Sequence, residues 1–211
     1  SAAVSSELRE KMGHAAVTAA KAAGYVNAGT IEFLLEPDGK FWFMEMNTRI
    51  QVEHPVTEWV TGIDLVKEQL KIASGMPLEI SQEDVRIQGH AIECRINAEN
   101  PQKNFRPSPG TIQGAHFPGG NGIRVDTCVY NGCKIPPYYD SMLAKLIVHA
   151  GNRKEAIAKM QSALGEVIID GIDTNIDYQY EILKDEDYQS GNFDTGFLAS
   201  HIIAGVKINE N

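Results

Sequence analysis

The sequence predicts an α+β fold in two parts: an antiparallel hairpin with helices, then a mainly β region that closes with helices. Three observations carry this prediction. Apolar residues recur at helical spacing near the start, two aromatic and apolar runs are joined by a Pro-Asp-Gly-Lys turn, and later β-type runs alternate with Pro- and Gly-rich turns. We expect domains at 1–85 and 86–204, and a tail at 205–211.

The first part is expected to begin with a helix and a hairpin. Ser5 or Ser6 provides an N-cap for a helix that ends at Gly24. The two runs over 30–36 and 41–46 favour antiparallel strands, because a tight turn lies between them.

After the hairpin, Asp64 is expected to cap a helix that stops at Gly75. In the second part, Asn152 caps a helix, and a short helix follows Thr195. The expected strands lie at 90–98, 111–117, 123–130 and 145–149, with one further helix at 174–184.

The composition excludes several classes of function. The formal net charge is −9, so bulk basicity cannot hold a nucleic acid, and any anion needs individually placed cations. Cys94, Cys128 and Cys133 lack the spacing of a zinc site or a disulfide framework, which favours a reducing cytoplasm. No apolar run is long enough to predict a membrane span.

The hairpin places two carboxylates opposite each other. A turn centred between Asp38 and Gly39 pairs Glu32 with Glu45, whether the loop has two or four residues. Opposed carboxylates repel unless a cation lies between them, and oxygen ligands favour Mg²⁺ or Mn²⁺ with substrate phosphates, which indicates a nucleotide. The alternative is a solvated pair with screened charges, and a three-residue loop would break the register.

Five polar side chains then occupy every second position: Glu45, Asn47, Arg49, Gln51 and Glu53. An extended chain would direct all five to one side. They offer an additional metal oxygen, a guanidinium for an anion, an amide donor and a carboxylate that can accept a proton. We therefore expect a small oxyanion to bind there, and the alternative is the polar outer face of an edge strand.

A second alternation surrounds Arg95, with Glu93 and Asn97 on the same side of an expected strand. An arginine beside carboxylates is usually a surface ion pair of small energetic weight. Spacing alone therefore does not select Arg95 as a functional residue.

The run from Glu45 to Glu58, EMNTRIQVEHPVTE, closely resembles the signature of biotin-dependent carboxylases. Similar stretches cover nearly the whole chain: GIDL at 62–65, ECRINAE at 93–99, PSPG at 107–110, PPYYDS at 136–141 and IIDG at 168–171. The resemblance implies the C-terminal part of an ATP-grasp domain, an antiparallel sheet with helices, over 1–85. Over 86–204 it implies the biotin carboxylase C-terminal domain, a β-sheet with closing helices.

The resemblance also implies roles for the residues of the hairpin. Glu32 and Glu45 would bind ATP through two Mg²⁺ or Mn²⁺ ions that bridge its phosphates, and Asn47 would complete the second metal site.

For the residues that follow, the resemblance implies bicarbonate binding by Arg49, Gln51 and the backbone of Val52. Glu53 would deprotonate bicarbonate for attack on the γ-phosphate, which gives carboxyphosphate. Arg95 would bind biotin and stabilise its enolate-like oxygen. Arg49, Glu53 and Arg95 are thus the expected catalytic residues.

The family's N-terminal domain, glycine-rich flap and phosphate-binding lysines have no counterpart in this sequence. We therefore expect the chain to be the C-terminal half of its parent and inactive alone. The implied partners are a biotin carboxyl carrier protein, which presents biotin, and carboxyltransferase subunits, with a homodimer at full length. Asn121 stands where many bacterial members have phenylalanine, whereas Arg124 is retained.

The residues of these motifs resemble those of acetyl-CoA carboxylase most. This enzyme, which catalyses the first step of malonyl-CoA and fatty acid synthesis, is therefore the expected parent. A pyruvate, propionyl-CoA or methylcrotonyl-CoA carboxylase is the alternative within the family. Outside it, the alternatives are another ATP-grasp ligase, such as carbamoyl-phosphate synthetase, and a non-catalytic assembly module.

Overall fold

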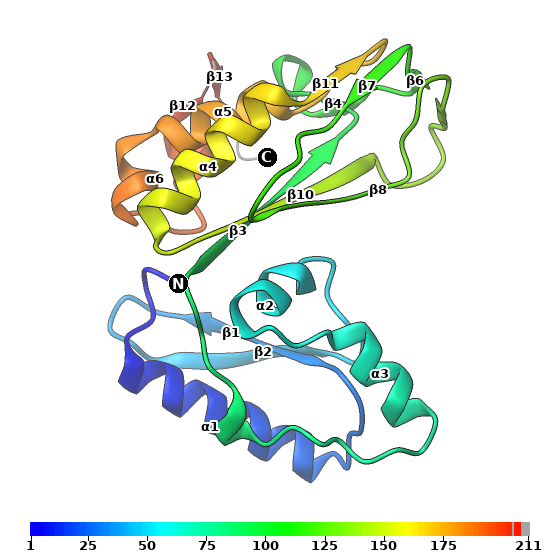
Figure 1. Cartoon of the computed structure of the whole chain (residues 1–211). Helices are drawn as coiled ribbons and strands as arrows, with labels where there is room; N and C mark the ends of the chain where they lie inside the picture. The colour runs from blue at the N-terminus through cyan, green and yellow to red at the C-terminus, as the bar shows by residue number, and fades with distance from the viewer. Residues whose placement is uncertain (204, 208–211) are drawn as a thin grey trace. The chain divides into compact units, whose positions relative to one another are not determined.

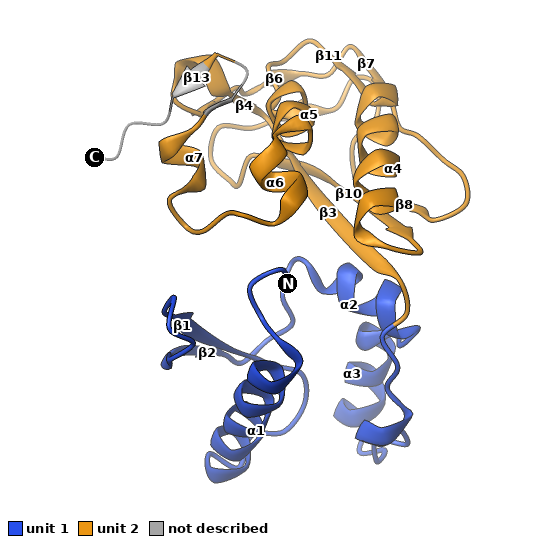
Figure 2. Cartoon of the chain, turned by 90° about the vertical axis from the view of Figure 1, so that its left-hand side faces the viewer, with its two compact units in different colours: residues 1–87 blue, residues 88–211 orange. Residues whose placement is uncertain are grey.

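The fold is known from a computed structural model that describes residues 1–203 and 205–207. The chain divides into two compact units, Ser1–Ile87 and Gln88–Asn211, close to the boundary expected after residue 85 (Figure 2). The expected tail at 205–211 lies mostly outside the described residues. Over the described part of the chain, no helix has both the length and the apolar character that crossing a membrane requires.

The first unit contains one hairpin, three α-helices and a short 3-10 turn (Figure 1). Its elements are α1 (Ser6–Ala22), β1 (Thr30–Leu35), β2 (Phe41–Asn47), α2 (His54–Thr61), α3 (Leu65–Ala73) and η1 (Gln82–Asp84).

The sequence signals at both predicted helices of this unit are confirmed. Ser5 caps α1, because its side chain accepts a hydrogen bond from the backbone N–H of Leu8. Asp64 caps α3 in the same way, through the N–H of Lys67. Gly75 ends that helix region with a positive φ of 86°.

The hairpin pairs Glu32 with Glu45, as predicted, but by a different route. The loop has three residues, with the N–H of Glu36 donating to the carbonyl of Lys40 and Gly39 at a φ of 85°. A β-bulge at Met44 then shifts the register by one residue before the carboxylate pair. The expectation that a three-residue loop would separate the pair is therefore wrong.

The extended row expected as far as Glu53 is also wrong. Strand β2 ends at Asn47, the chain bends at 48–49, and Glu53 is the N-cap of α2, a helix that the sequence patterns did not predict. Pro55 in the first turn and Gly62, in the left-handed conformation at the C-cap, are the ordinary signals of such a helix.

The second unit is built on a three-stranded antiparallel sheet with the order β3-β10-β8. Its strands are β3 (His90–Asn97), β8 (Ile123–Thr127) and β10 (Met142–Ala150). One face of β3 packs into the core through Ile92, Cys94 and Ile96, and Arg95 is exposed on the other face. The predicted alternation around Arg95 is therefore confirmed.

Four helices follow the sheet: α4 (Arg153–Glu166), α5 (Ile176–Lys184), α6 (Glu186–Ser190) and α7 (Phe197–Ser200). Helix α4 packs against β10 and β3, and α5 packs against α4. Met160 and Leu164 of α4 and Leu146 of β10 are fully buried between these layers. This cluster is the core of the second unit.

Short ladders complete this unit. The strand expected over 111–117 is split, because its residues pair with two different partners, β9 and β11. The short elements are β4 (Glu99–Asn100), η2 (Pro101–Lys103), β5 (Arg106–Pro107), β6 (Gly110–Thr111), β7 (Gly114–His116), β9 (Lys134–Ile135), β11 (Ile168–Asp170), β12 (Ile202–Ile203) and β13 (Val206–Lys207).

Candidate functional site

The paired carboxylates of the hairpin are joined by one amide. Nδ2 of Asn47 donates to Oε1 of Glu32 at 2.8 Å and to Oε1 of Glu45 at 2.9 Å. The amide thus occupies the position between two negative groups where the sequence predicts a cation. Each of these carboxylates has a second oxygen, so the pair retains hard oxygen ligands that suit Mg²⁺ or Mn²⁺.

Asn47 presents its nitrogen to the carboxylates and its oxygen to Arg49, whose Nη2 lies 2.9 Å from Oδ1. A half-turn of the amide exchanges these two atoms and turns Oδ1 towards the carboxylates. The donor set of two carboxylates and one amide oxygen therefore fits a divalent cation.

The bend after β2 brings Arg49 and Gln51 into the same network. Nε2 of Gln51 donates to Oε1 of Glu32 at 3.0 Å, and Nη1 of Arg49 donates to Oε1 of Gln51. Arg49 also donates to the carbonyl of Ile50 at 3.2 Å. A guanidinium has five N–H groups, so N–H groups of Arg49 beyond these bonds can bind an anion.

Five of the predicted residues therefore form one connected network, although they do not lie on one extended strand. Glu53 is exposed at the start of α2, and Val52 lies in the turn that precedes this helix. The structure thus gathers Glu32, Glu45, Asn47, Arg49 and Gln51, and places Glu53 at the end of the same bend.

His54 anchors this bend. Nδ1 of His54 lies 2.8 Å from the carbonyl oxygen of Gln51, and because a carbonyl only accepts, Nδ1 carries the proton. In the sequence, this anchor is marked by the His-Pro pair at the start of α2, because the proline ring fixes the backbone there.

Arg95 lies in the second unit, in a row of charged residues across the sheet. It pairs with Lys145 on β10, which pairs with Asp126 on β8. Nζ of Lys145 is 3.3 Å from Oδ2 of Asp126, and Arg124 makes a bidentate contact with the same carboxylate at 2.8 and 2.9 Å. Glu93 lies two residues before Arg95 on β3. The group therefore contains three basic side chains and the carboxylates of Asp126 and Glu93, so its net charge is positive.

The pKa of Asp126 reflects its two basic neighbours. Burial raises the pKa of this carboxyl, but hydrogen bonds and charges from Arg124 and Lys145 lower it by more. The net pKa is therefore below the ordinary value, and Asp126 is ionised at neutral pH.

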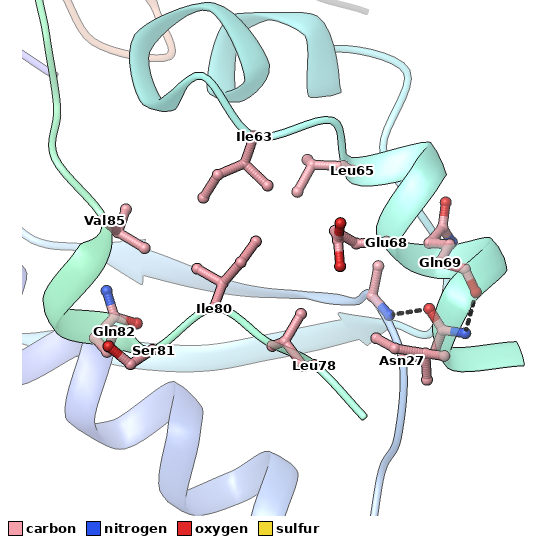
Figure 3. A pocket seen from close by; sticks show the side chains of 12 residues that line it. Asn27, Ile63, Leu65, Glu68, Gln69, Leu78, Ile80, Ser81, Gln82 and Val85 are labelled. Atoms are coloured by element: carbon pink, nitrogen blue, oxygen red, sulfur yellow. Dashed lines mark hydrogen bonds between the residues drawn. The ribbon is translucent and has the colours of Figure 1, made fainter. Parts of the chain in front are cut away.

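The first unit also contains a cavity of about 280 Å³ beside α3, and none of the predicted site residues lines it (Figure 3). Its wall is largely apolar, with Leu65, Leu78 and Ile80 facing the carboxylate of Glu68. Oε1 of Glu68 pairs with Nζ of Lys71 at 2.8 Å, whereas Oε2 is buried without a hydrogen-bond partner among the described residues. The cavity thus has a buried carboxylate oxygen of Glu68 in a largely apolar wall.

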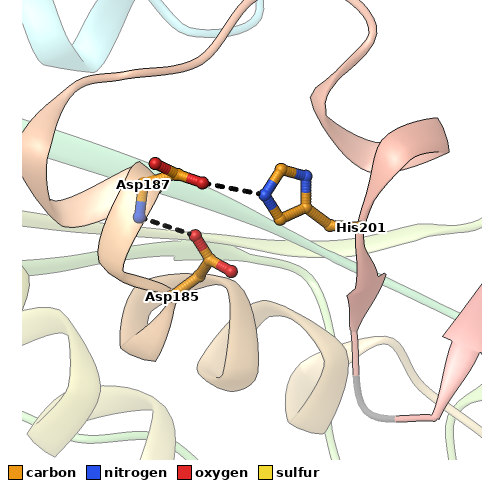
Figure 4. A group of neighbouring side chains, drawn as sticks. All are labelled: Asp185, Asp187 and His201. Carbon is orange, nitrogen blue, oxygen red and sulfur yellow. Dashed lines mark hydrogen bonds and ion pairs between the residues drawn. The ribbon is translucent and has the colours of Figure 1, made fainter.

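Asp185, Asp187 and His201 form a second group of side chains with metal-ligating atoms (Figure 4). Asp185 is the N-cap of α6 and accepts from the N–H groups of Asp187 and Tyr188. Nε2 of His201 lies 3.1 Å from Asp187, and this hydrogen bond raises the pKa of the imidazole. The hydrogen bond between His201 and Asp187 links the residue that follows α7 to α6.

Two sequence families match the chain. Residues 93–200 match the biotin carboxylase C-terminal domain, and residues 1–81 match the ATP-binding domain of the carbamoyl-phosphate synthase L chain.

Curated relatives are similar over almost the whole chain. Biotin carboxylase 1 of Bacillus subtilis is 58% identical over 97% of this chain and 46% of its own length. A pyruvate carboxylase subunit from Methanothermobacter thermautotrophicus is 56% identical over 91% of this chain and 39% of its own length. The chain therefore spans less than half the length of these two relatives.

Solved structures have the same fold. The biotin carboxylase domain dimer of Hydrogenobacter thermophilus 2-oxoglutarate carboxylase, in complex with MgADP, ADP and bicarbonate, superposes with a TM-score of 0.91 at 51% identity, covering 93% of this chain and 43% of that one. The biotin carboxylase–β,γ-ATP complex from Campylobacter jejuni gives a TM-score of 0.90 at 45% identity, covering 94% of this chain and 44% of that one.

Proposed function

We propose that this chain is the C-terminal half of an enzyme that carboxylates biotin with ATP and bicarbonate. This proposal follows from its family, because the chain belongs to the biotin carboxylases. The first unit is then the C-terminal part of an ATP-grasp domain, and the second is the biotin carboxylase C-terminal domain. The connected network from Glu32 to Gln51 carries this proposal, since it combines oxygen ligands for a cation with donors for an anion.

Glu32, Glu45 and Asn47 would hold divalent cations, Mg²⁺ or Mn²⁺, together with the phosphates of ATP. When bound, these ions neutralise the phosphate charge and polarise the γ-phosphoryl group. Support comes from the paired carboxylates in this structure and from the MgADP in the Hydrogenobacter relative.

Arg49, Gln51 and the backbone of Val52 would bind bicarbonate. Glu53 would remove its proton while a bicarbonate oxygen attacks the γ-phosphorus and ADP leaves with the electron pair of the broken bond. The product is carboxyphosphate. The bicarbonate in the Hydrogenobacter structure supports an anion site in this family.

Arg95 would act in the second half of the reaction, on biotin. Carboxyphosphate decomposes to CO₂ and phosphate, the phosphate takes the N1′ proton of biotin, and the guanidinium stabilises the enolate-like oxygen. The positive balance of the group formed by Arg95, Lys145 and Arg124 with their two carboxylates suits a developing anion.

Several properties of the parent enzyme belong to the same proposal. Biotin would arrive on a carrier protein, carboxyltransferase subunits would use the product, and the full-length enzyme would be a homodimer, as the Hydrogenobacter domain is. The exposed free thiol of Cys128 suits a reducing compartment, so we place the parent in the cytoplasm.

For the final acceptor we propose acetyl-CoA, with pyruvate, propionyl-CoA and methylcrotonyl-CoA as alternatives. The relatives named for biotin carboxylase and for pyruvate carboxylase are 58% and 56% identical, so identity alone does not separate these acceptors. Carboxylation assays with each acceptor and the assembled parent enzyme would separate them.

The test is ATP hydrolysis by the full-length parent with free biotin, with and without bicarbonate and Mg²⁺. Glu53→Gln should reduce bicarbonate-dependent hydrolysis at least about 100-fold, because the base is lost. Glu83→Gln, an exposed carboxylate of the same unit, is the matched control and should leave the rate unchanged. Near-normal activity of Glu53→Gln would show that Glu53 is not the base. A rate of ATP hydrolysis that does not increase when biotin is added would favour a ligase of the carbamoyl-phosphate synthetase type.

A further inference from the structure

Asn175 is a buried asparagine whose side chain lies against the edge of the strand that carries Arg95. Only 8% of its surface is exposed, and among the described residues it is the single buried side chain that is polar or charged. A buried amide needs hydrogen-bond partners, so the identity of those partners indicates its role.

All of its described side-chain partners are backbone groups of β3. Nδ2 of Asn175 donates to the carbonyl of Arg95 at 3.1 Å, and Oδ1 accepts from the N–H of Asn97 at 2.9 Å. Its own backbone N–H donates to the carbonyl of Asn97 at 3.2 Å. Because β3 is the edge strand of its sheet, Asn175 takes the place of a neighbouring strand there.

A second amide reaches the same carbonyl. Gln179, one turn further along α5, donates Nε2 to the carbonyl of Arg95. Two side chains of one helix region therefore hold the backbone of a single residue, Arg95.

The position of Asn175 makes this use of its side chain informative. It is the N-cap of α5 but makes no capping hydrogen bond with its side chain. Asn152, the N-cap of α4 in the same unit, does cap its helix and accepts from the N–H of Glu155 at 3.0 Å. The side chain of Asn175 therefore bonds to the backbone of β3 instead of to the N–H groups at the start of α5.

We infer that Asn175, assisted by Gln179, is a positioning residue for Arg95 in the biotin half of the reaction. The inference rests on the proposed function, in which the Arg95 guanidinium stabilises the biotin oxygen. Fixing the backbone at Arg95 and Asn97 fixes the origin of the arginine side chain, and a displacement of about 1 Å at a reacting group can cost about 100-fold in rate.

The experiment compares Asn175→Ala with the wild type in the full-length parent. Biotin carboxylation should fall about 10-fold in kcat, because Arg95 is misplaced, whereas bicarbonate-dependent ATP hydrolysis measured without biotin and the KM for ATP should change less than about 2-fold. Asn175→Asp keeps the acceptor for Asn97 but loses the donor to Arg95, and it should show the same split.

The matched control is Asn152→Ala, which removes an N-cap asparagine from the same unit without touching β3. It should lower stability but leave the ratio of the two activities unchanged. A readout apart from catalysis is hydrogen exchange at the amide of Asn97, which should become faster in Asn175→Ala and not in Asn152→Ala.

A double-mutant cycle decides whether the effect passes through Arg95. In an Arg95→Ala background, Asn175→Ala should cause no further loss of biotin carboxylation. Equal loss of both activities in Asn175→Ala, the same split in Asn152→Ala, or additive losses in the double variant would each overturn the inference. A wild-type parent without biotin-dependent turnover would instead overturn the proposed function, and this inference with it.

Discussion

The two units differ in how they bury apolar side chains. Within residues 1–87, Pro55 is the only buried residue, and Trp42 and Phe43 of the hairpin are 57% and 60% exposed. In the second unit, Leu146 and Val148 of β10 are fully buried under α4. One unit thus has a core of its own, and the other presents apolar strand surface to solvent.

This difference concerns function, because most proposed site residues lie in the unit without a core. Glu32, Glu45 and Asn47 are held by their mutual hydrogen bonds rather than by packing. Since the chain spans less than half the length of the two curated relatives compared, we propose that the remainder of the parent covers this hairpin. The 211-residue chain alone is then expected to show no ATP-dependent carboxylation of biotin, and measurable turnover would contradict this.

The largest expected effect is the protection of the Cys94 thiol from alkylation. Slow alkylation would confirm that the core of the second unit excludes the reagent. Burial raises the pKa of its thiol to about 12, whereas Cys128 is exposed. At pH 8, alkylation of Cys94 should be more than about 1000-fold slower than that of Cys128. Mass spectrometry of the native chain measures both rates, and comparable rates would mean that the core opens readily.

A pair of leucine truncations compares the units directly. Leu146→Ala should lower the free energy of unfolding of the second unit by about 3 kcal/mol, because it leaves a cavity in the core. Leu70→Ala on α3, where the side chain is 68% exposed, should cost less than about 0.5 kcal/mol. Denaturant titration of the 211-residue chain measures both, and an equal cost would show that the first unit has a core after all.

Helix caps give smaller effects that distinguish the units. Asn152→Ala should destabilise the second unit by about 1 kcal/mol, and Asp64→Ala should destabilise the first by a similar amount. If the units unfold separately, each variant shifts its own transition in calorimetry. A shift of one common transition by both variants would show that the units unfold together.

The smallest effect is the pH dependence of the His201–Asp187 contact. The hydrogen bond raises the pKa of His201 above 6.5, so its contribution is present below pH 6.5 and is lost as pH rises through the raised pKa. The pKa of Asp187 lies below 3.8, so its contribution is lost as pH falls through that lowered value. The Tm difference between the wild type and His201→Gln should therefore be largest between about pH 4 and 6.5, and a difference that does not vary with pH would exclude the ion pair.

Sequence reasoning predicted the elements whose signals are local. The caps at Ser5, Asp64 and Asn152 are confirmed, because each depends on neighbours in sequence. The pairing of Glu32 with Glu45 is also confirmed, but it arises from a three-residue loop and a bulge that the sequence patterns did not predict. The bend after Asn47 was missed, since alternation of polar residues describes a strand and a side-chain network equally well. The contacts of Asn175 connect positions about 80 residues apart, and no local pattern predicts such contacts.

The bulge at Met44 has a consequence for how the hairpin tolerates change. Without the bulge, a two- or four-residue loop would also bring Glu32 opposite Glu45, so two different combinations of loop and strand lead to one arrangement of carboxylates. Both combinations use the same number of residues between Glu32 and Glu45, so a substitution at Pro37–Gly39 that changes the turn can be absorbed by loss of the bulge. The outer end of the hairpin can therefore change its turn at constant length while Glu32 and Glu45 stay opposite each other.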